Sequence, residues 1–454
     1  MRFADLADRR VAVWGFGREG HAALAALQLR LPGQPVTLFC SAAEAPYGHA
    51  VHPAVEVVVE TPSAGMLSSY DVVIKSPGIS AYRPEILEAQ HNGTRFTSGT
   101  ALWFAENRAA RVIGVTGTKG KSTVSALVAH LLRALGRRVA LAGNIGLPLL
   151  ELLDAEPPPD WWVVELSSFQ TREAGALEVA LVSNLYEEHL DWHGTRERYA
   201  EDKLALATVA RTLLVDSRQS ELVGRTASHA DRRLFGDAHG WHVDGDAIVR
   251  GRERAFALAD SPLPGAHNAF NACAALAAIE AAGEDALAAA RAIATFRPLP
   301  HRLQSLGTQG GIDYVDDSIS TTPQATLEAL ASFGTRAVSV LVGGHDRGLD
   351  WHAFAEAVRR EPPHAIVTMG ANGARIAALL HETGGAYTLA SAPTLADAFA
   401  LARAATPPGG VVLLSPGAPS FDQFKDYAER GCAFARLAGF VPAAIGRIEG
   451  LGIA

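Results

Sequence analysis

The sequence GVTGTKGKST (Gly114–Thr123) joins a short apolar run to a segment of helical periodicity. A glycine-rich turn between a strand and a helix exposes successive backbone N–H groups, and the positive end of the helix dipole adds to their attraction for phosphate. In such loops the lysine, here Lys121, reaches the β- and γ-phosphates, and a hydroxyl, here that of Ser122 or Thr123, binds Mg²⁺. The predicted nucleotide-phosphate loop consists of Gly117, Thr118, Gly120, Lys121, Ser122 and Thr123.

This loop departs from the common pattern G-x-x-x-x-G-K-[ST], because Val115 occupies its first glycine position. The alternative is an ordinary glycine-rich turn that serves packing alone. The lysine and the two hydroxyl residues that follow Gly120 favour the phosphate loop over that alternative.

The composition is that of a folded enzyme. The chain has 454 residues, of which 48% are hydrophobic and 19% charged, and at roughly 150 residues per domain this length predicts three domains. The net charge of -8 and the lack of a long basic block argue against a nucleic-acid partner. The three cysteines form no CxxC pair, so we expect small buried side chains in a reducing compartment.

The sequence does not predict export or membrane insertion. Its first ten residues, MRFADLADRR, are charged where a signal peptide would be apolar. The most apolar long segment, Ala272–Ala294, is interrupted by charged residues and is therefore not a span of about 20 apolar residues. We expect a cytoplasmic protein without a membrane partner.

The motif GFGREG (Gly15–Gly20) follows an apolar run and matches the dinucleotide fingerprint G-x-G-x-x-G. The next predicted strand ends in Phe39-Cys40-Ser41, without the acidic residue that would bind a ribose. A diphosphate at Gly15 and Gly17 is the functional prediction, and a tight turn needed for packing alone is the alternative.

Strand-like and helix-like segments alternate in three blocks, the pattern of parallel sheets covered by helices. We predict an α/β protein with a Rossmann-like N-terminal domain at 1–107, a central P-loop ATPase-like domain at 108–304, and a C-terminal Rossmann-like domain at 305–454. The expected strands are 11–14, 36–39, 55–59, 72–74, 139–141, 162–166, 180–183, 213–215, 312–315, 338–342, 365–368 and 411–414, with a small β segment at 244–257 and a last helix from about Phe421.

Two carboxylate-bearing segments follow predicted strands of the central block. ELSSFQ (Glu165–Gln170) places Glu165 beside the phosphate loop, where it would hold a metal ion or its water shell; a solvated loop carboxylate is the alternative. NLYEEHLDWH (Asn184–His193) offers Glu188, His189 and Asp191 one strand later. For His189 a metal-ligand role is favoured over a structural one.

Three further positions remain open on residue type alone. Lys203, on a predicted helix, is typical of a solvated lysine. Asn268 and Asn271 share one face of a helix start, where their amides would pair with an adenine edge or cap the helix. Arg302, at a predicted domain junction, is either a γ-phosphate contact or a surface arginine.

Together these motifs resemble the Mur ligases, ATP-dependent enzymes that form amide bonds in peptidoglycan synthesis. GFGREG, SPGIS (Ser76–Ser80) and LLSPGAPSFDQFKDYAERG (Leu413–Gly431) are similar to those of the members that attach glutamate to UDP-N-acetylmuramoyl-L-alanine. The segments that carry the family resemblance are TGTKGKST (116–123), GNIG (143–146), ELSSFQ (165–170), EEH (187–189), HNAFNA (267–272), PHR (300–302) and DDS (316–318).

The resemblance implies that ATP phosphorylates the carboxylate of the UDP-linked alanine and that the amine of glutamate attacks the acyl phosphate. Residues 1–107 would bind the UDP-linked substrate, 108–304 ATP, and 305–454 glutamate, in a chain that acts as a monomer. Two Mg²⁺ ions with lysine and arginine would hold the charge that water otherwise stabilises.

The same resemblance implies roles for individual residues. The implied catalytic residues are Lys121, Asn144, His189, Lys203 and Arg302. One Mg²⁺ would be held by Ser122 or Thr123 with Glu165, and the second by His189, supported by Lys203 as a carbamate. Asn268 and Asn271 would face adenine, Arg302 the γ-phosphate, and Asp317 the ribose. The implied substrate contacts are Gly15, Gly17, Ser76 and Gly78 for the UDP-linked substrate, and Thr321, Arg347, Ser420 and the backbone near Tyr427 for glutamate.

One departure bears on the amino acid that is added. Members that add D-glutamate usually have DSKATN where this chain has DSISTT (Asp317–Thr322), so Ile319 replaces a lysine. Loss of a cation there would change how a carboxylate is oriented, and we predict L-glutamate, with D-glutamate as the alternative. Arg347 stands where lysine also occurs, and its guanidinium can bind a carboxylate through two hydrogen bonds.

Two other functions are compatible with part of this sequence. A folylpolyglutamate synthase shares the ATP-binding and C-terminal blocks but begins near its phosphate loop, so the long first block argues against it. A non-catalytic nucleotide-binding partner of a cell-wall complex would be expected to lose its phosphate and metal residues. This chain keeps Lys121, Glu165, His189, Lys203 and Arg302.

Overall fold

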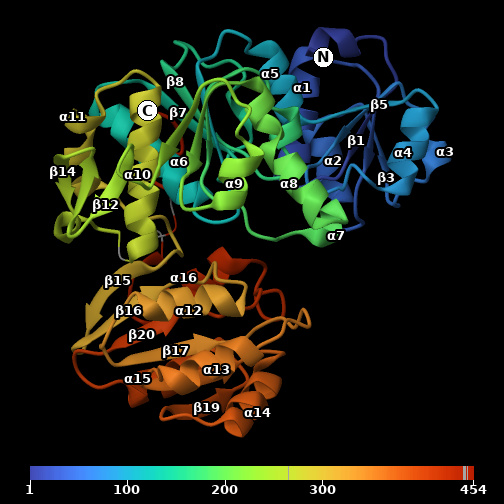
Figure 1. The fold of residues 1–454 in the computed structure, drawn as a ribbon. Coiled ribbons are helices and arrows are strands. Elements are labelled where there is room, and N and C mark those ends of the chain that lie inside the picture. Colours follow the sequence, from blue (N-terminus) through green and yellow to red (C-terminus); the bar gives the residue numbers. More distant parts are fainter. Residues whose placement is uncertain (264, 443–445, 447) are drawn as a thin grey trace. The chain divides into compact units, whose positions relative to one another are not determined.

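The computed structural model describes residues 1–263, 265–442, 446 and 448–454. It divides into two compact units, and both are of the predicted α/β class (Figure 1). The first unit contains Met1–Ser261, His267–Phe296 and Gly450–Ala454, and the second contains Pro262–Ala266 and Arg297–Glu449.

The first unit begins with a five-stranded sheet in the order β3-β2-β1-β4-β5, in which all neighbours are parallel. Its central strands are continuous apolar runs because helices cover both faces: Trp14 and Val73 pack toward α3 and α4, while Val13 packs toward α1. The elements are η1 (Phe3–Leu6), β1 (Val11–Trp14), α1 (Arg18–Arg30), β2 (Val36–Phe39), α2 (Ala45–Val51), β3 (Val55–Val58), α3 (Ala64–Leu67), β4 (Val72–Lys75), α4 (Pro84–His91), β5 (Arg95–Thr97) and α5 (Gly99–Glu106).

A second sheet in the first unit has the order β11-β10-β9-β6-β8-β7-β21. Its strands are parallel except β21, which returns from the end of the chain and pairs antiparallel with β7. Its elements are β6 (Val112–Thr116), α6 (Lys121–Ala134), β7 (Val139–Gly143), η2 (Leu149–Leu152), β8 (Trp161–Glu165), η3 (Thr171–Glu173), β9 (Leu177–Val182), α7 (Leu190–His193), α8 (Arg196–Leu204), η4 (Ala205–Val209), β10 (Ala210–Asp216), α9 (Ser220–Arg225), β11 (Arg232–Phe235) and β21 (Gly452–Ile453).

The predicted small β segment is a three-stranded antiparallel sheet, β12-β13-β14. It precedes α10, which contains the first part of the alanine-rich segment Ala272–Ala294. The elements here are β12 (Trp241–Asp244), β13 (Ala247–Arg250), β14 (Glu253–Ala257), η5 (Leu258–Asp260), α10 (Ala266–Ala281), α11 (Ala286–Ala290) and η6 (Arg291–Thr295).

The first two sheets share one hydrophobic core. Trp103 of α5 and Trp162 of β8 are both buried, and their ring centroids lie 4.6 Å apart. The same cluster contains residues of α1 and of both sheets. The loops of the first sheet are therefore held in a fixed relation to those of the second.

The second unit has one sheet, β15-β16-β20-β17-β18-β19, parallel except for β15. Alternate strand residues face opposite sides, so Val340 packs with α12–α14 and Leu341 with α15 and α16. The elements are β15 (Gln304–Gln309), β16 (Ile312–Asp316), α12 (Pro323–Ala331), β17 (Val338–Val342), α13 (His352–Arg360), β18 (Ala365–Met369), α14 (Gly373–Thr383), β19 (Thr388–Ala392), α15 (Leu395–Ala405), β20 (Val411–Leu414) and α16 (Tyr427–Leu437).

Two expectations from composition concern this fold. Across the residues that the structure describes, no helix combines the length and the apolar character that crossing a membrane requires. Cys40 and Cys273 are buried, as predicted, and Cys432 is half-buried.

Candidate active site

Three loops meet at the carboxyl edge of the second sheet. In that sheet β6 lies between β8 and β9, and all three strands are parallel. The carboxyl ends of parallel strands lie at the same edge, where open α/β sheets bind ligands. The phosphate loop, the ELSSFQ segment and the NLYEEH segment are therefore neighbours.

The phosphate loop requires its glycines. Gly117 has φ 151° and Gly120 has φ 77°, conformations that favour glycine. A Cβ on Gly117 would lie 1.9 Å from Ser183 Oγ, and a Cβ on Gly120 would lie 2.6 Å from Asn271 Oδ1. The loop is thus fitted closely against β9 and α10.

Asn184 holds the phosphate loop in shape, and the sequence analysis did not single it out. Its Oδ1 accepts hydrogen bonds from the backbone N–H groups of Thr118, at 2.9 Å, and Lys119, at 2.7 Å. The Thr118 hydroxyl lies 2.7 Å from Tyr199 OH. An asparagine directly after an apolar strand was the signal available in the sequence.

Lys121 begins helix α6, and its Nζ donates a hydrogen bond to Thr118 O at 3.0 Å. The ammonium group therefore lies over the loop that precedes it. Ser122 and Thr123, on the first turn of the same helix, are mostly buried. This arrangement of a lysine and two hydroxyl groups is the one expected for binding a nucleotide phosphate and its Mg²⁺.

Glu165 ends strand β8 and is 1% exposed, so the solvated-carboxylate alternative is wrong. Asn144 donates a hydrogen bond from Nδ2 to Glu165 Oε1 at 2.7 Å. Within the described residues, Glu165 Oε2 is buried and has no hydrogen-bond partner. A buried acceptor without a donor is costly, so this oxygen fits a cation, and carboxylate and hydroxyl oxygens are ligands that Mg²⁺ prefers.

The protein supplies few ligands for such a cation. Among the residues described, no group of three or more His, Cys, Asp and Glu side chains could hold a metal ion. Mg²⁺ usually keeps several waters and binds one or two carboxylates together with substrate phosphates. The residues present fit Mg²⁺ that arrives with a nucleotide, and not a metal cage made by the protein alone.

His189 has an unusual backbone conformation for a residue other than glycine, with φ 56°, and caps the short helix α7. Its side chain is 48% exposed. Burial and the charge of Lys121 lower the pKa of the imidazole, against the opposing effect of Glu188. The neutral imidazole is the form that binds a metal.

Lys203 is 1% exposed, so the interpretation as a solvated lysine is wrong. Its Nζ donates a hydrogen bond to Gly117 O at 2.8 Å and lies 5.0 Å from the centroid of the Tyr199 ring. Burial, followed by the charge of Lys121, lowers the pKa of Lys203 well below its usual range. Residue type could not reveal this, because the side chain crosses from α8 to a loop far away in the sequence.

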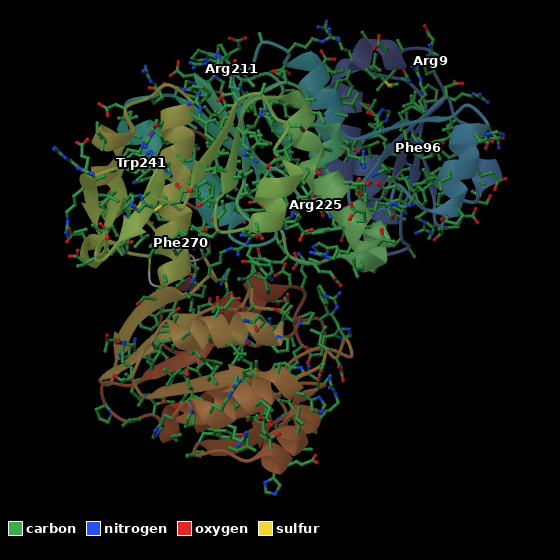
Figure 2. The ribbon with its side chains drawn as sticks, viewed as in Figure 1. Arg9, Phe96, Arg211, Arg225, Trp241 and Phe270 are labelled. Atoms are coloured by element: carbon green, nitrogen blue, oxygen red, sulfur yellow. The ribbon has the colours of Figure 1, made fainter. Side chains whose placement is uncertain are left out.

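The two asparagines on α10 share one face, as predicted. Asn271 donates a hydrogen bond from Nδ2 to Asn268 Oδ1 at 3.0 Å, and Asn271 also lies against Gly120 of the phosphate loop. Phe270, which lies between them in the sequence and is labelled in Figure 2, packs against Arg218. The guanidinium carbon of Arg218 lies 3.3 Å from the centroid of the Phe270 ring. The helix start that carries these amides thus borders the phosphate loop.

The loops after β1 and β4 meet in the first sheet, because these strands are neighbours in it. Ser76 Oγ donates a hydrogen bond to Gly15 O at 3.2 Å, and Gly15 has φ 91°. A Cβ on Gly20 would lie 1.9 Å from Gly15 O, the close approach expected of this fingerprint's third glycine. Gly17 and Gly78 are exposed in these loops.

Arg18 links the first sheet to the second. It follows Gly17 at the start of α1, and its Nη1 donates a hydrogen bond to Gly146 O at 3.2 Å. Gly146 belongs to the GNIG loop that carries Asn144. The contact joins residues 128 positions apart and is not predicted by either motif.

The second unit has a polar cluster where β16 ends. His301 Nδ1 lies 2.6 Å from Asp316 Oδ2. Asp317 Oδ1 accepts a hydrogen bond from Leu303 N at 3.1 Å, and its Oδ2 accepts one from Ser415 Oγ at 2.8 Å. Burial raises the pKa of Asp317 to about 6.

The predicted glutamate contacts lie on loops after three adjacent strands, β16, β20 and β17. Thr321 is half-buried, Arg347 is exposed, and Ser420 is 2% exposed. Tyr427 begins α16, and its carbonyl oxygen accepts a hydrogen bond from Ser318 Oγ at 2.7 Å. Ile319 is half-buried in the first of these loops.

Arg430 supports these loops and was not predicted. It is 1% exposed, and its Nη2 donates hydrogen bonds to Ser318 O, at 2.8 Å, and Ala418 O, at 3.0 Å. It therefore joins the loop after β16 to the loop after β20. Arg302 is half-buried at the start of the same unit.

Two segments of the chain match models of known protein families. Residues 115–279 match the Mur ligase middle domain, and residues 301–417 match the Mur ligase glutamate ligase domain. The chain belongs to the Mur ligase family. Members of this family are ATP-dependent ligases, which agrees with the phosphate loop and the predicted enzyme class.

Relatives of this Mur ligase extend over its full length. It is 54% identical to the UDP-N-acetylmuramoyl-L-alanine–L-glutamate ligase of Xanthomonas euvesicatoria, with 100% of both chains covered. In structure it resembles the UDP-N-acetylmuramate–alanine ligase of Thermotoga maritima (TM-score 0.63, 18% identity, 95% of this chain and 99% of that chain). It also resembles the MurF ligase of Thermotoga maritima in complex with ADP (TM-score 0.57, 15% identity, 96% of both chains). The structural likenesses support the three-domain α/β fold.

Proposed function

We propose that this Mur ligase joins the amine of L-glutamate to the carboxylate of UDP-N-acetylmuramoyl-L-alanine, using ATP and an acyl phosphate, in peptidoglycan precursor synthesis. The full-length identity of 54% to a relative that bears the name of this activity is the observation that carries the proposal. Because both ATP and UDP-linked precursors are cytoplasmic metabolites, we place the activity in the cytoplasm, and we propose that the chain acts as a monomer.

In this proposal residues 1–107 bind the UDP-linked substrate through Gly15, Gly17, Ser76 and Gly78. Two features support the assignment. The loops after β1 and β4 lie together at the point where the strand order reverses, where ligands bind in sheets of this kind. In addition, Gly17 caps α1 without a side-chain hydrogen bond, so the backbone N–H groups at the helix start are available for a diphosphate.

The central residues 108–304 bind ATP and Mg²⁺. Lys121 would hold the β- and γ-phosphates, and Asn268 and Asn271 would face the adenine. Ser122 or Thr123 and Glu165 would hold one Mg²⁺, and His189 the second; when bound, these ions would lend positive charge to the transferring phosphoryl group. The partnerless Glu165 Oε2, within the residues described, supports the first metal assignment.

Lys121 and Asn144 would then stabilise the phosphate that is transferred. Lys121 would place its positive charge near that phosphate. Asn144, which donates a hydrogen bond to Glu165, would lie near the same phosphate. Charged groups fixed in this way stabilise a transition state without having to reorganise.

For Lys203 we propose a carbamate. The ammonium group first loses one proton, and the neutral amine attacks CO₂. A C–N bond forms as one C–O π bond breaks, and a second proton leaves the nitrogen, so that the cation becomes an anion. The low pKa that burial gives Lys203 favours the neutral amine that this step needs. The anion would support the second Mg²⁺.

Residues 305–454 would bind glutamate through Thr321, Arg347, Ser420 and the backbone near Tyr427. From the domain junction and β16, Arg302 would contact the γ-phosphate and Asp317 the ribose. The L configuration is supported by the named relative and by Ile319, which replaces the lysine of D-glutamate-adding members.

An assay with purified protein tests the proposal. The protein is incubated with UDP-N-acetylmuramoyl-L-alanine, ATP, Mg²⁺ and either glutamate enantiomer, and ADP and the ligated product are measured. We expect product with L-glutamate. Product with D-glutamate alone would exclude the L assignment, and no product with either enantiomer would exclude the ligase assignment.

A further inference from the structure

Asp202 is a buried carboxylate that the proposed reaction does not use. It is 1% exposed and directly precedes Lys203 on α8. Its Oδ2 lies 2.6 Å from His193 Nδ1, and its Oδ1 accepts hydrogen bonds from Tyr82 OH, at 2.6 Å, and from Arg172 Nε. Three segments far apart in the sequence therefore converge on one side chain.

The contact with His193 reaches the loop that carries His189. His193 is fully buried at the end of α7, and its backbone N–H donates a hydrogen bond to His189 O at 3.1 Å. With Nδ1 donating to Asp202, Nε2 accepts a hydrogen bond from Ser168 Oγ, 3.0 Å away. The carboxylate thus fixes the imidazole of His193, and through it the single helical turn that follows His189.

The contact with Tyr82 reaches the first sheet. Tyr82 follows the loop after β4, and its ring packs edge-on against Trp192, with centroids 5.6 Å apart. Trp192 donates a hydrogen bond from Nε1 to Pro77 O at 3.0 Å and accepts one from Ser80 Oγ at 2.6 Å. The loop proposed to bind the UDP-linked substrate is therefore fixed to α7, and through Tyr82 to Asp202.

Helix α8 has another anchor at its solvent-facing start. Arg225 of α9, labelled in Figure 2, makes two hydrogen bonds of 2.7 Å to the carboxylate of Glu197. That pair holds the first turn of α8. Asp202 lies about one and a half turns later, beside Lys203, so it is placed to set the position of Lys203 near the phosphate loop.

We propose that Asp202 is a positioning residue, which fixes Lys203 and the His189 loop together and ties both to the substrate loop through Tyr82. This inference rests on the proposed function for the roles of His189 and Lys203. Because the Asp202 carboxylate binds all three segments, loss of its hydrogen bond to Tyr82 should shift the His189 and Lys203 side chains, although Tyr82 contacts neither of them.

The test compares Asp202→Asn and Tyr82→Phe with wild-type protein. Residues that orient metal ligands typically cost about 10- to 100-fold in metal affinity or activity when they are replaced. We expect kcat to fall about tenfold or more in Asp202→Asn and about threefold or more in Tyr82→Phe, with KM for ATP within about twofold of wild type. Mn²⁺ binding in the presence of ADP, followed by electron paramagnetic resonance, should weaken about fivefold or more in Asp202→Asn.

Glu284→Gln is the matched control. Glu284 is another largely buried carboxylate of the same unit, held by Trp161 Nε1 at 3.0 Å and by Arg137, and it lies beyond the far end of α10. We expect its substitution to lower thermal stability while kcat and Mn²⁺ binding stay unchanged.

Two outcomes would overturn the inference. The first is that Asp202→Asn keeps the kcat and Mn²⁺ affinity of wild type. The second is that Glu284→Gln loses both in proportion to its loss of stability, because the effect of Asp202→Asn would then be one of general stability. Failure of the proposed function gives a different result, because wild-type protein would then form no product. The Mn²⁺ affinities of wild type and the variants would still test the role of Asp202.

Discussion

Asn144 donates a hydrogen bond of 2.7 Å to one oxygen of Glu165, and in the described part of the chain the other oxygen, Oε2, is buried without a partner. The amide therefore orients the carboxylate and leaves one oxygen for a ligand. A buried acceptor without a donor opposes folding, so Glu165 lowers stability in the protein without its ligand.

Glu165→Gln should separate these two effects. Without nucleotide, we expect the melting temperature to stay the same or to rise, because a buried carboxylate oxygen without a hydrogen-bond donor is removed. Addition of ADP with Mg²⁺ should raise the melting temperature of the variant much less than that of wild type, and kcat should fall about 100-fold or more. Equal stabilisation of both proteins by the nucleotide would contradict the metal assignment.

Lys121→Ala should abolish turnover, because its ammonium lies over the phosphate loop. Loss of a positioned charge at a transferring phosphate costs about 10²- to 10³-fold or more. ADP formation is the measurement, and circular dichroism checks that the variant is folded. Substantial residual activity would mean that the loop is structural.

Lys203 should carry a carbamate in the active protein. ¹³C-labelled bicarbonate should give a carbamate resonance in wild type and none in Lys203→Ala, and removal of bicarbonate should lower the rate. The variant should also lose activity, because the hydrogen bond from Lys203 to Gly117 O disappears with the anion. Unchanged activity after both treatments would exclude the carbamate.

Asp317 makes stability depend on pH. Its pKa is raised from 3.8 to about 6 in the folded protein, chiefly by burial. Below about pH 3 the carboxyl group is protonated in both states. As the pH rises from there toward about 6, the unfolded chain releases its proton first, and the free energy of unfolding falls. The full cost, about 1–3 kcal/mol, applies above pH 6.

Asp317→Asn should remove this cost. Compared with wild type by urea unfolding, the variant should be more stable at pH 8 by about 1–3 kcal/mol, and the difference should vanish below about pH 3. The serine hydroxyl at Ser415 can turn to accept a hydrogen bond from the new amide. A variant that is less stable than wild type at pH 8 would contradict the sign.

Ile319→Lys tests the origin of enantiomer preference. A new ammonium group in the loop after β16 would attract a glutamate carboxylate to a different position. We expect kcat/KM for L-glutamate to fall about tenfold and the ratio of D- to L-glutamate activity to rise. Ile319→Val, which keeps the charge unchanged, should show neither effect; if it does, the size of the side chain is responsible instead.

The apolar strands could be predicted from the sequence, and several edge strands could not. Central strands such as β1 and β17 are buried on every residue and appear as continuous apolar runs. In contrast β15, β19 and β11 lie at sheet edges with partly exposed polar residues. Their pairing depends on a neighbour and leaves little trace in their own sequence.

One boundary was misplaced for a local reason. The last predicted helix was expected from about Phe421 and begins at Tyr427. Asp426 caps it, because its side chain accepts a hydrogen bond from Glu429 N at 2.9 Å. An aspartate three residues before a glutamate is a helix-start signal that was present in the sequence.

The local motifs of the site were predictable because strand, loop and spacing are written in consecutive residues. Residues that act across long separations were not. Asn184 holds a loop 65 residues earlier in the chain, and Lys203 reaches a carbonyl group 86 residues earlier. Neither a residue's type nor its spacing indicates whether a distant segment buries it. The burial of Lys203 could therefore be found only from the structure.

Strand β21 gives the second unit the connectivity of an inserted domain. The chain leaves the first unit at Phe296, and Gly452 and Ile453 pair with Leu141 and Ala140 of β7. Val139 N–H donates a hydrogen bond to Ala454 O at 2.8 Å. A single protease cut in one connection would therefore leave the second unit attached by the other, and removal of the last five residues would turn β7 into an open sheet edge, prone to pairing with another chain.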